Sequence, residues 1–188
     1  MVVWRRGRHL RWRRRRDNID LWLAIAIVAG LAGYQIYQHW NAEPRPPIIG
    51  RARVIDRDSL EIGGTRIRLE GIDAPELEQT CTDSKGWSWP CGRAATRELR
   101  AHIHGQELDC DNLGLDRYQR VLAVCALPDG SGINPWLVQQ GWAVASGLAY
   151  DSEQSEAQSA HRGIWAGSFM PPWQWRQRHQ FNSDAQGN

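Results

Sequence analysis

Residues 56–76 read DRDSLEIGGTRIRLEGIDAPE and combine a strand pattern with a dense set of charged side chains. Apolar and polar residues alternate, with Ile67 and Leu69 on one face and Arg68 on the other, as in a half-buried strand. Gly63-Gly64 supplies a tight turn back from the run that precedes it. The stretch therefore predicts a β-hairpin whose acidic residues lie at strand ends and in loops, where ligands bind.

The charged side chains of this hairpin favour metal-assisted chemistry on an anion. The carboxylates provide oxygen donors without a neighbouring histidine or cysteine, a set that selects Ca²⁺ or Mg²⁺ over zinc. Arg68 suits the planar capture of two phosphate oxygens, and because it is always charged it cannot act as the base. A carboxylate is left to take the proton. The alternative is a solvated loop in which the acids pair with nearby arginines.

A second arginine follows in a matching context, in the sequence Asp116-Arg-Tyr-Gln-Arg120 before an apolar strand. With these motifs in this order, the chain from Ile49 to Arg176 resembles the staphylococcal nuclease (thermonuclease) family. The family's Asp-Gly-Asp-Thr/Ser turn corresponds to residues 56–59, and its Arg-Leu-x-x-Ile-Asp-x-Pro-Glu motif to residues 68–76. Its Asp-x-Tyr-Gly-Arg motif corresponds to residues 116–120. Further matches lie at residues 91–95, 134–143 and 163–165.

The resemblance implies a calcium site and a general base. Asp58 and Asp73 would ligate Ca²⁺, together with the backbone carbonyl of Ala74. Glu76 would activate water as the general base. The implied reaction is Ca²⁺-dependent endonucleolytic hydrolysis of DNA or RNA, which agrees with the chemistry inferred from the hairpin.

The resemblance also implies how substrate is held. Arg68 and Arg120 would bind the scissile phosphate and stabilise charge in the transition state. Tyr118 and Tyr150 would lie near the nucleotide, although a core or rim position is the alternative for each. A binding-only barrel, either a catalytically weak nucleic-acid-binding module or one that merely binds calcium, is the alternative function. The complete set of acids and arginines favours the enzyme.

Two residues depart from the family pattern. Arg57 replaces the glycine between the first two acids, and Gln119 replaces the glycine before the second catalytic arginine. If either position requires a positive φ, the larger side chain adds strain of about 1 kcal/mol or more. Alternatively, Arg57 contacts a substrate phosphate. Neither change removes a ligand, the base or a phosphate-binding arginine.

The N-terminal region predicts a membrane anchor. Eight arginines lie between Arg5 and Arg16. An uncharged segment from Leu21 follows, and about 20 such residues suffice to cross a bilayer as a helix. By the positive-inside rule the basic leader stays in the cytoplasm. The alternative is that the arginine- and tryptophan-rich leader binds nucleic acid.

The same segment leaves open whether the anchor is retained. An apolar run of about 14 residues also suits a signal peptide, with Gly30-Leu-Ala32 as a small-residue cleavage site. We expect a retained signal anchor. Either alternative exports the remainder, so the predicted location is the inner membrane, with the C-terminal domain in the periplasm or outside the cell.

The chain has four cysteines, all beyond the apolar segment. Four cysteines allow three pairings. Local closure favours Cys81 with Cys91, and Cys110 with Cys125, because the latter two lie on runs that read as adjacent strands. Disulfides fit an exported chain. Free buried thiols or a zinc site are the alternatives, but the sequence has no Cys-x-x-Cys.

Charge separates the leader from the rest of the chain. Beyond position 40 there are 15 Arg and Lys against 19 Asp and Glu, a balance of −4, although the whole chain carries +2. The C-terminal part is therefore not a generally basic nucleic-acid-binding protein. We expect the affinity for nucleic acid to depend on the metal and a few local arginines. We also expect a monomer, and the sequence indicates no protein partner.

The pattern predicts an α+β fold, a five-stranded OB-type barrel with about three helices after one transmembrane helix. The expected strands are 48–55, 59–62, 65–69, 107–110 and 121–127. The expected helices are 93–103, one capped by Asn134 and ended by Gly141, and one from Asp151 to Gly163. The predicted organisation is a leader (1–20), an anchor (21–40), a linker (41–48), the nuclease-like domain (49–176) and a disordered tail (177–188).

Overall fold

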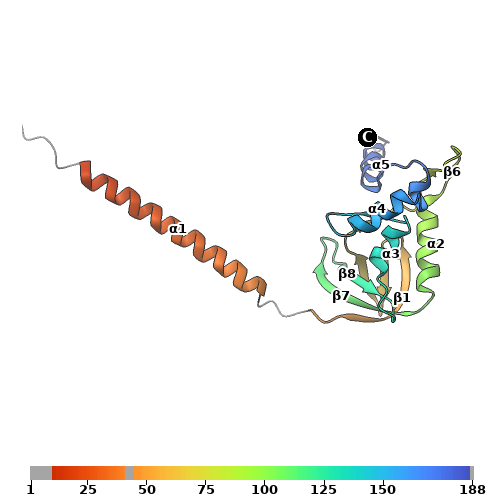
Figure 1. Cartoon of the computed structure of the whole chain (residues 1–188), viewed down its shortest axis with the longest axis horizontal. Coiled ribbons are helices and arrows are strands. Elements are labelled where there is room, and N and C mark those ends of the chain that lie inside the picture. Colours follow the sequence, from red (N-terminus) through yellow and green to blue (C-terminus); the bar gives the residue numbers. More distant parts are fainter. Residues whose placement is uncertain (1–9, 41–44, 187–188) are drawn as a thin grey trace, which may run out of the picture. The chain divides into compact units, whose positions relative to one another are not determined.

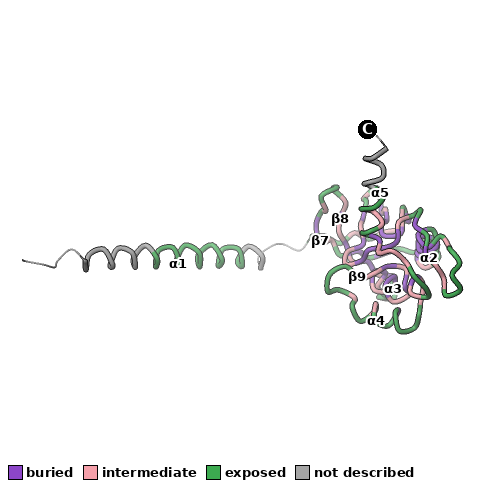
Figure 2. Tube along the Cα trace, turned by 90° about the horizontal axis from the view of Figure 1, so that it is seen from above, coloured by how far each residue is buried: buried purple, intermediate pink, exposed green. Residues whose placement is uncertain are grey.

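The computed structural model describes the backbone of residues 10–40 and 45–186, and the side chains of residues 21–37 and 45–179. The chain divides into two compact units, Met1–Pro44 and Arg45–Asn188. The first contains helix α1 (Leu10–Trp40), on which residues 21–37 are exposed (Figure 2). Among the described residues, no helix has the length and apolar character needed to cross a bilayer.

The second unit is built around a closed five-stranded barrel with the strand order β1-β2-β3-β8-β7. Neighbouring strands are antiparallel except β3 and β8, which are parallel. The predicted α+β fold with a five-stranded barrel is confirmed. The strands are β1 (Ile48–Asp56), β2 (Ser59–Ile62), β3 (Thr65–Leu69), β7 (Glu107–Leu115) and β8 (Val121–Ala126).

The β2–β3 hairpin matches its prediction in detail. Gly63 and Gly64 have φ values of 57° and 84°, which is the left-handed backbone that a tight hairpin turn requires. Ile67 and Leu69 are fully buried in the barrel core. Because side chains alternate along a strand, Arg68 lies on the opposite face of β3, half-buried.

In the described part of the second unit, four α-helices and one 3-10 helix accompany the barrel. α2 packs against β1, and α3 packs against β8 and α4 (Figure 1). α4 ends at Ser159, before the predicted Gly163, where the 3-10 helix begins. α5 continues through Gln186, into the segment for which a disordered tail is predicted. The bounds are α2 (Cys91–Ile103), α3 (Ile133–Gln139), α4 (Asp151–Ser159), η1 (Gly163–Ala166) and α5 (Pro172–Gln186).

The predicted capping role of Asn134 is wrong, because the N-cap of α3 is Gly132. Asn134 is fully buried, and its Oδ1 accepts a hydrogen bond from the backbone N–H of Cys125 at 3.1 Å. Its Nδ2 donates to the carbonyl oxygens of Glu70 at 2.8 Å and Ala123 at 3.2 Å. Asn134 thus ties α3 to β8 and to the chain leaving β3.

Both predicted disulfides are confirmed. Cys110 and Cys125 face each other across β7 and β8, with their Cα atoms 4.0 Å apart. Cys81 and Cys91, with Cα atoms 5.6 Å apart, join a small sheet to the start of α2. That sheet is formed by β5 (Cys81–Thr82) and β6 (Ser88–Trp89), and a second pairs β4 (Ile72–Asp73) with β9 (Val144–Ala145).

Candidate active site

A polar cleft of about 750 Å³ opens beside the end of the barrel where the hairpin meets β8. Five arginines and two acids line it, within a domain whose formal charge is negative, so the positive charge is local. Such a cleft attracts an anion. Its lining residues are Arg57, Arg68, Glu76, Asp116, Arg117, Tyr118, Arg120, Leu122, Trp173, Arg176 and Gln177.

Asp58 and Arg68 form an ion pair at one side of the cleft. Nη1 of Arg68 donates to Oδ2 of Asp58 at 2.6 Å, and the hydroxyl of Ser59 donates to Oδ1 at 2.9 Å. Ser59 and Arg68 are direct partners in the β2–β3 register. Asp58 is only 1% exposed. Arg68 has five N–H donors, and those not used on Asp58 remain for an anion in the cleft.

Arg120 is held by Asp116 on the turn before β8. Nε of Arg120 donates to Oδ2 of Asp116 at 2.8 Å, and its backbone N–H donates to Oδ1 at 2.9 Å. Burial raises the pKa of Asp116, but hydrogen bonds from Arg120 and Tyr118 outweigh this and hold it below its ordinary value. Nη1 of Arg120 reaches the hydroxyl of Ser59 at 3.5 Å. The two predicted phosphate-binding arginines therefore both lie on the side of β2 that carries the Ser59 side chain.

Asp73 and Glu76 are joined by an arginine from the last helix. Nη1 and Nη2 of Arg176 donate to Oδ1 and Oδ2 of Asp73, at 2.8 and 3.0 Å. Nη1 also donates to Oε1 of Glu76 at 3.0 Å. These bonds, above all those to Asp73, raise the pKa of Arg176, so the guanidinium is charged at every accessible pH.

Arg57 points inward and occupies the other oxygen of Glu76. Its Nη2 lies 2.6 Å from Oε2 of Glu76, and its Nη1 lies 2.5 Å from Oδ2 of Asp56. Its side chain is 11% exposed, and its Nε is buried without a hydrogen-bond partner among the described residues. Arg57 does not have a positive φ, whereas Gln119 does, at 61°. The backbone strain considered for the two departures therefore applies to Gln119 alone.

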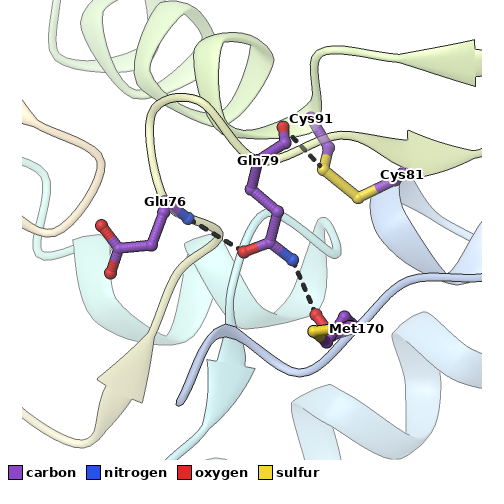
Figure 3. The surroundings of a disulfide bond; sticks show 5 residues. All are labelled: Glu76, Gln79, Cys81, Cys91 and Met170. Carbon is purple, nitrogen blue, oxygen red and sulfur yellow. Dashed lines mark hydrogen bonds between the residues drawn. A yellow bond between two sulfur atoms is a disulfide. The ribbon is translucent and has the colours of Figure 1, made fainter. Parts of the chain in front are cut away.

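The loop that carries Glu76 is anchored by the fully buried Gln79 (Figure 3). Oε1 of Gln79 accepts a hydrogen bond from the backbone N–H of Glu76 at 3.1 Å, and Nε2 donates to the carbonyl of Met170 at 2.6 Å. The carbonyl of Gln79 accepts from the N–H of Gly92 at 3.3 Å. It also lies 3.4 Å from the sulfur of Cys91, a contact only, because a disulfide sulfur carries no hydrogen.

The predicted aromatic contacts divide between two places. Tyr118 lines the cleft with its ring exposed, and the guanidinium carbons of Arg117 and Arg120 lie 4.8 and 5.5 Å from the ring centre. Tyr150 instead packs against the hydrophobic core and Gly71. Burial, then Glu153 and Glu70, raise the pKa of Tyr150. Tyr150 thus lies partly buried against the core and is not among the residues that line the cleft.

The residues near the cleft fit a hard divalent cation by donor chemistry. Asp58 and Asp73 are 1% and 8% exposed, and their carboxylates are the kind of donor that Ca²⁺ and Mg²⁺ select. Ala74, whose carbonyl was predicted as a further ligand, is fully buried beside Asp73. Arg68 pairs with Asp58 and Arg176 pairs with Asp73, so an arginine balances the negative charge of each carboxylate. Among residues with described side chains, no three His, Cys, Asp or Glu residues are grouped as a metal cage.

The sequence predicted a role for five of the residues that line the cleft, Arg57, Arg68, Glu76, Tyr118 and Arg120, but assigned none to Gln79, Arg176 or Trp173. Gln79 carries no charge and falls in no motif, so nothing in the sequence singles it out. Arg176 was only the last residue of the resemblance, and Trp173, 48% exposed on the same helix, had no assigned role. The position of Trp173 and Arg176 near residues 57–76 depends on how α5 folds back, which local patterns do not encode.

Comparisons with known proteins identify the family of this chain. Residues 66–167 match the family model described as staphylococcal nuclease homologue. The chain is 41% identical over 131 residues to the succinoglycan biosynthesis protein ExoI of Rhizobium meliloti, covering 66% of this chain and 68% of that protein. It is 32% identical over 139 residues to an uncharacterized endonuclease of Escherichia coli, covering 67% and 82%.

A plant relative shows the same similarity over a shorter part of its length. The probable staphylococcal-like nuclease CAN1 of Oryza sativa subsp. japonica is 32% identical over 118 residues, which cover 59% of this chain and 32% of that protein. The matched family segment includes Arg68, Glu76 and Arg120 of the cleft. The chain belongs to the staphylococcal nuclease family.

Proposed function

We propose that this protein is a Ca²⁺-dependent nuclease that hydrolyses phosphodiester bonds of DNA or RNA in the arginine-lined cleft. The observation that carries the proposal is the presence of a carboxylate, Glu76, in the same cleft as Arg68 and Arg120. Family membership supports the same reaction class. A cleft with these side chains supplies a proton acceptor and two fixed cations, which are the groups that phosphodiester hydrolysis requires.

In the proposed mechanism, Arg68 and Arg120 bind the non-bridging oxygens of the scissile phosphate. Asp58 and Asp116 fix the two guanidinium groups, so they need little reorganisation as negative charge grows in the transition state. Glu76 takes the proton of the attacking water. Ca²⁺, held by Asp58, Asp73 and the carbonyl of Ala74, would polarise the phosphate and stabilise its charge.

The test is nuclease activity of the purified full-length protein on DNA and RNA, with Ca²⁺ and with chelator. We expect cleavage that stops on chelation. Glu76→Gln should suppress turnover while leaving Ca²⁺ binding largely intact, whereas Asp73→Asn should weaken both. Glu78→Gln is the matched control, since Glu78 lies on the same loop but is exposed and pairs with Arg93. Nucleic-acid binding without cleavage would favour the binding-only module instead.

We further propose that the domain is exported and held at the membrane by residues 21–40, with the N-terminus in the cytoplasm. The two disulfides support an oxidising compartment, and the arginine leader supports the orientation. A reporter that works only outside the cytoplasm, fused after Asn188, should be active and should sediment with membranes. Activity of a cytoplasmic reporter at the same site would show the opposite orientation.

A further inference from the structure

Arg176 enters the cleft from a part of the chain that the family match does not include. The match ends at residue 167, and α5 begins at Pro172. The side chain of Arg176 is 36% exposed, whereas those of Asp73 and Glu76 are 11% and 15% exposed. The guanidinium therefore closes over two largely buried carboxylates from the solvent side.

The contact with Asp73 uses both carboxylate oxygens. The two parallel N–H donors of Arg176 lie 2.8 and 3.0 Å from Oδ1 and Oδ2, which is the bidentate geometry that makes arginine–carboxylate pairs strong and directional. A guanidinium bound in this way stabilises the negative charge of the carboxylate. It also occupies lone pairs that a metal ion would use.

We propose that Arg176 is a positioning residue of the active site. It binds Asp73 and Glu76 when no divalent cation is bound, and it releases Asp73 when the cation binds. The inference rests on the proposed function, because Asp73 is the proposed cation ligand and Glu76 the proposed base. A divalent cation on Asp73 repels the nearby guanidinium. The two cations also compete for the same oxygens.

Glu76 keeps its orientation through this exchange. Arg57 holds Oε2 at 2.6 Å, and Arg176 holds Oε1 at 3.0 Å. When Arg176 leaves Asp73, its contact with Glu76 is the one that remains. Removing the guanidinium therefore has two opposite effects: cation binding becomes tighter because a competitor is gone, and turnover falls because the base loses one of its two arginine partners.

The experiment compares Arg176→Gln and Arg176→Lys with wild type in the full-length protein. Ca²⁺ binding is measured by calorimetry without nucleic acid, and kcat and KM are measured on DNA at saturating Ca²⁺. Arg178→Gln is the control, since Arg178 is exposed on the same helix and does not line the cleft.

For Arg176→Gln we expect a Ca²⁺ dissociation constant lower by about tenfold, the size of one lost charge-assisted contact. We expect kcat to fall by roughly ten- to a hundredfold through the misplaced base, with KM little changed. Arg176→Lys should give intermediate values, because an ammonium group does not reproduce the fork. Arg178→Gln should match wild type.

A merely structural role for Arg176 predicts the opposite sign, with weaker Ca²⁺ binding as α5 loosens. Unchanged or weaker binding by folded Arg176→Gln, beside a wild type that binds Ca²⁺ and cleaves, would overturn this inference and leave the proposed function standing. If neither protein binds Ca²⁺, both fail. If Arg176→Gln does not fold, Arg176→Lys decides by the same sign.

Discussion

Gly92 lies against the backbone of Glu76, so closely that a Cβ atom on Gly92 would stand 1.8 Å from the carbonyl oxygen of Glu76. Gly92 is in the first turn of α2, next to Cys91 of a disulfide. The helix, the disulfide and Gln79 therefore fix one loop, and that loop carries the proposed base. The scaffold determines the position of the proposed base through backbone contact, which leaves no room for a side chain on Gly92.

Replacing Gly92 with alanine should damage both stability and turnover. The added methyl meets backbone atoms, so α2 or the loop must move, at a cost of about 1–3 kcal/mol in the free energy of unfolding. Because the loop carries Glu76, kcat should fall more than KM rises. Urea denaturation and steady-state kinetics check this. Wild-type values for both would show that the contact relaxes without consequence.

Both disulfides should contribute to stability, but only one of them should affect activity. Each closes a short loop, with sequence separations of 10 and 15, so replacing either pair by alanines should lower the free energy of unfolding by about 3 kcal/mol. Only the loss of Cys81–Cys91 should also lower kcat, because Cys91 contacts the carbonyl of Gln79. Equal kinetic effects from both double variants would contradict this assignment.

The hairpin and barrel were predictable because their signals are local. Alternation over residues 65–69 and the Gly63-Gly64 turn specify one pairing register, and a shift by one residue would expose Ile67 and Leu69. The Cys110–Cys125 pair follows from the β7–β8 register, in which the two residues are directly opposed, and the short separation of 10 favours Cys81 with Cys91. The proposed acids and arginines lie near the ends of these strands and in the loops that connect them.

The remainder depends on contacts between distant segments. Asn134 has the sequence context of a helix cap, but its buried side chain binds three backbone groups of β8 and the chain after β3. Gln79 binds Met170, 91 positions away, and Arg176 binds Asp73, 103 positions away. Such tertiary contacts outweigh local preference and leave no periodic pattern in the sequence.

His102 should make the protein less stable in mild acid. Its ring stacks on Trp136 at 3.7 Å, and Nε2 is buried without a partner among the described residues. Burial lowers its pKa below 6.5, although Asp129 partly opposes this. The unfolded chain therefore binds the proton more readily, so the stabilisation is present above pH 6.5 and is lost as the pH falls through the folded pKa.

The measurement for His102 is the free energy of unfolding at pH 7.5 and pH 5. Wild type should lose stability over this interval, and His102→Phe, which retains a stacking ring, should lose less. The exposed His104 provides the control as His104→Asn. Asp116 does not confuse the comparison, because its lowered pKa places its effect at more acidic pH. The same loss in wild type and His102→Phe would exclude His102 as the cause.

Gln119→Gly should stabilise the protein slightly. Gln119 has a φ of 61°, where glycine is free of the steric cost that a side chain carries, and the gain is partly offset by the greater freedom of the unfolded chain. The net increase in the free energy of unfolding should be below about 1 kcal/mol. Arg120 should keep its place because Asp116 holds it, so kcat should not change. A clear loss of stability by urea denaturation would contradict the strain argument.

Arg57→Gly restores the other family glycine and should have the reverse effect. Arg57 has no positive φ, so glycine relieves no strain there. The change also removes an arginine side chain, 11% exposed, that pairs with both Asp56 and Glu76. The free energy of unfolding should fall by about 1–3 kcal/mol, as for other broken charge-assisted contacts. Glu76 also loses one of its two arginines, so kcat should fall.

Arg57→Lys, which retains one charge but not the two-armed contact, should recover only part of both losses. Urea denaturation and kinetics on the three proteins decide the matter: if Arg57→Gly is as stable and active as wild type, Arg57 neither supports the hairpin nor orients the base.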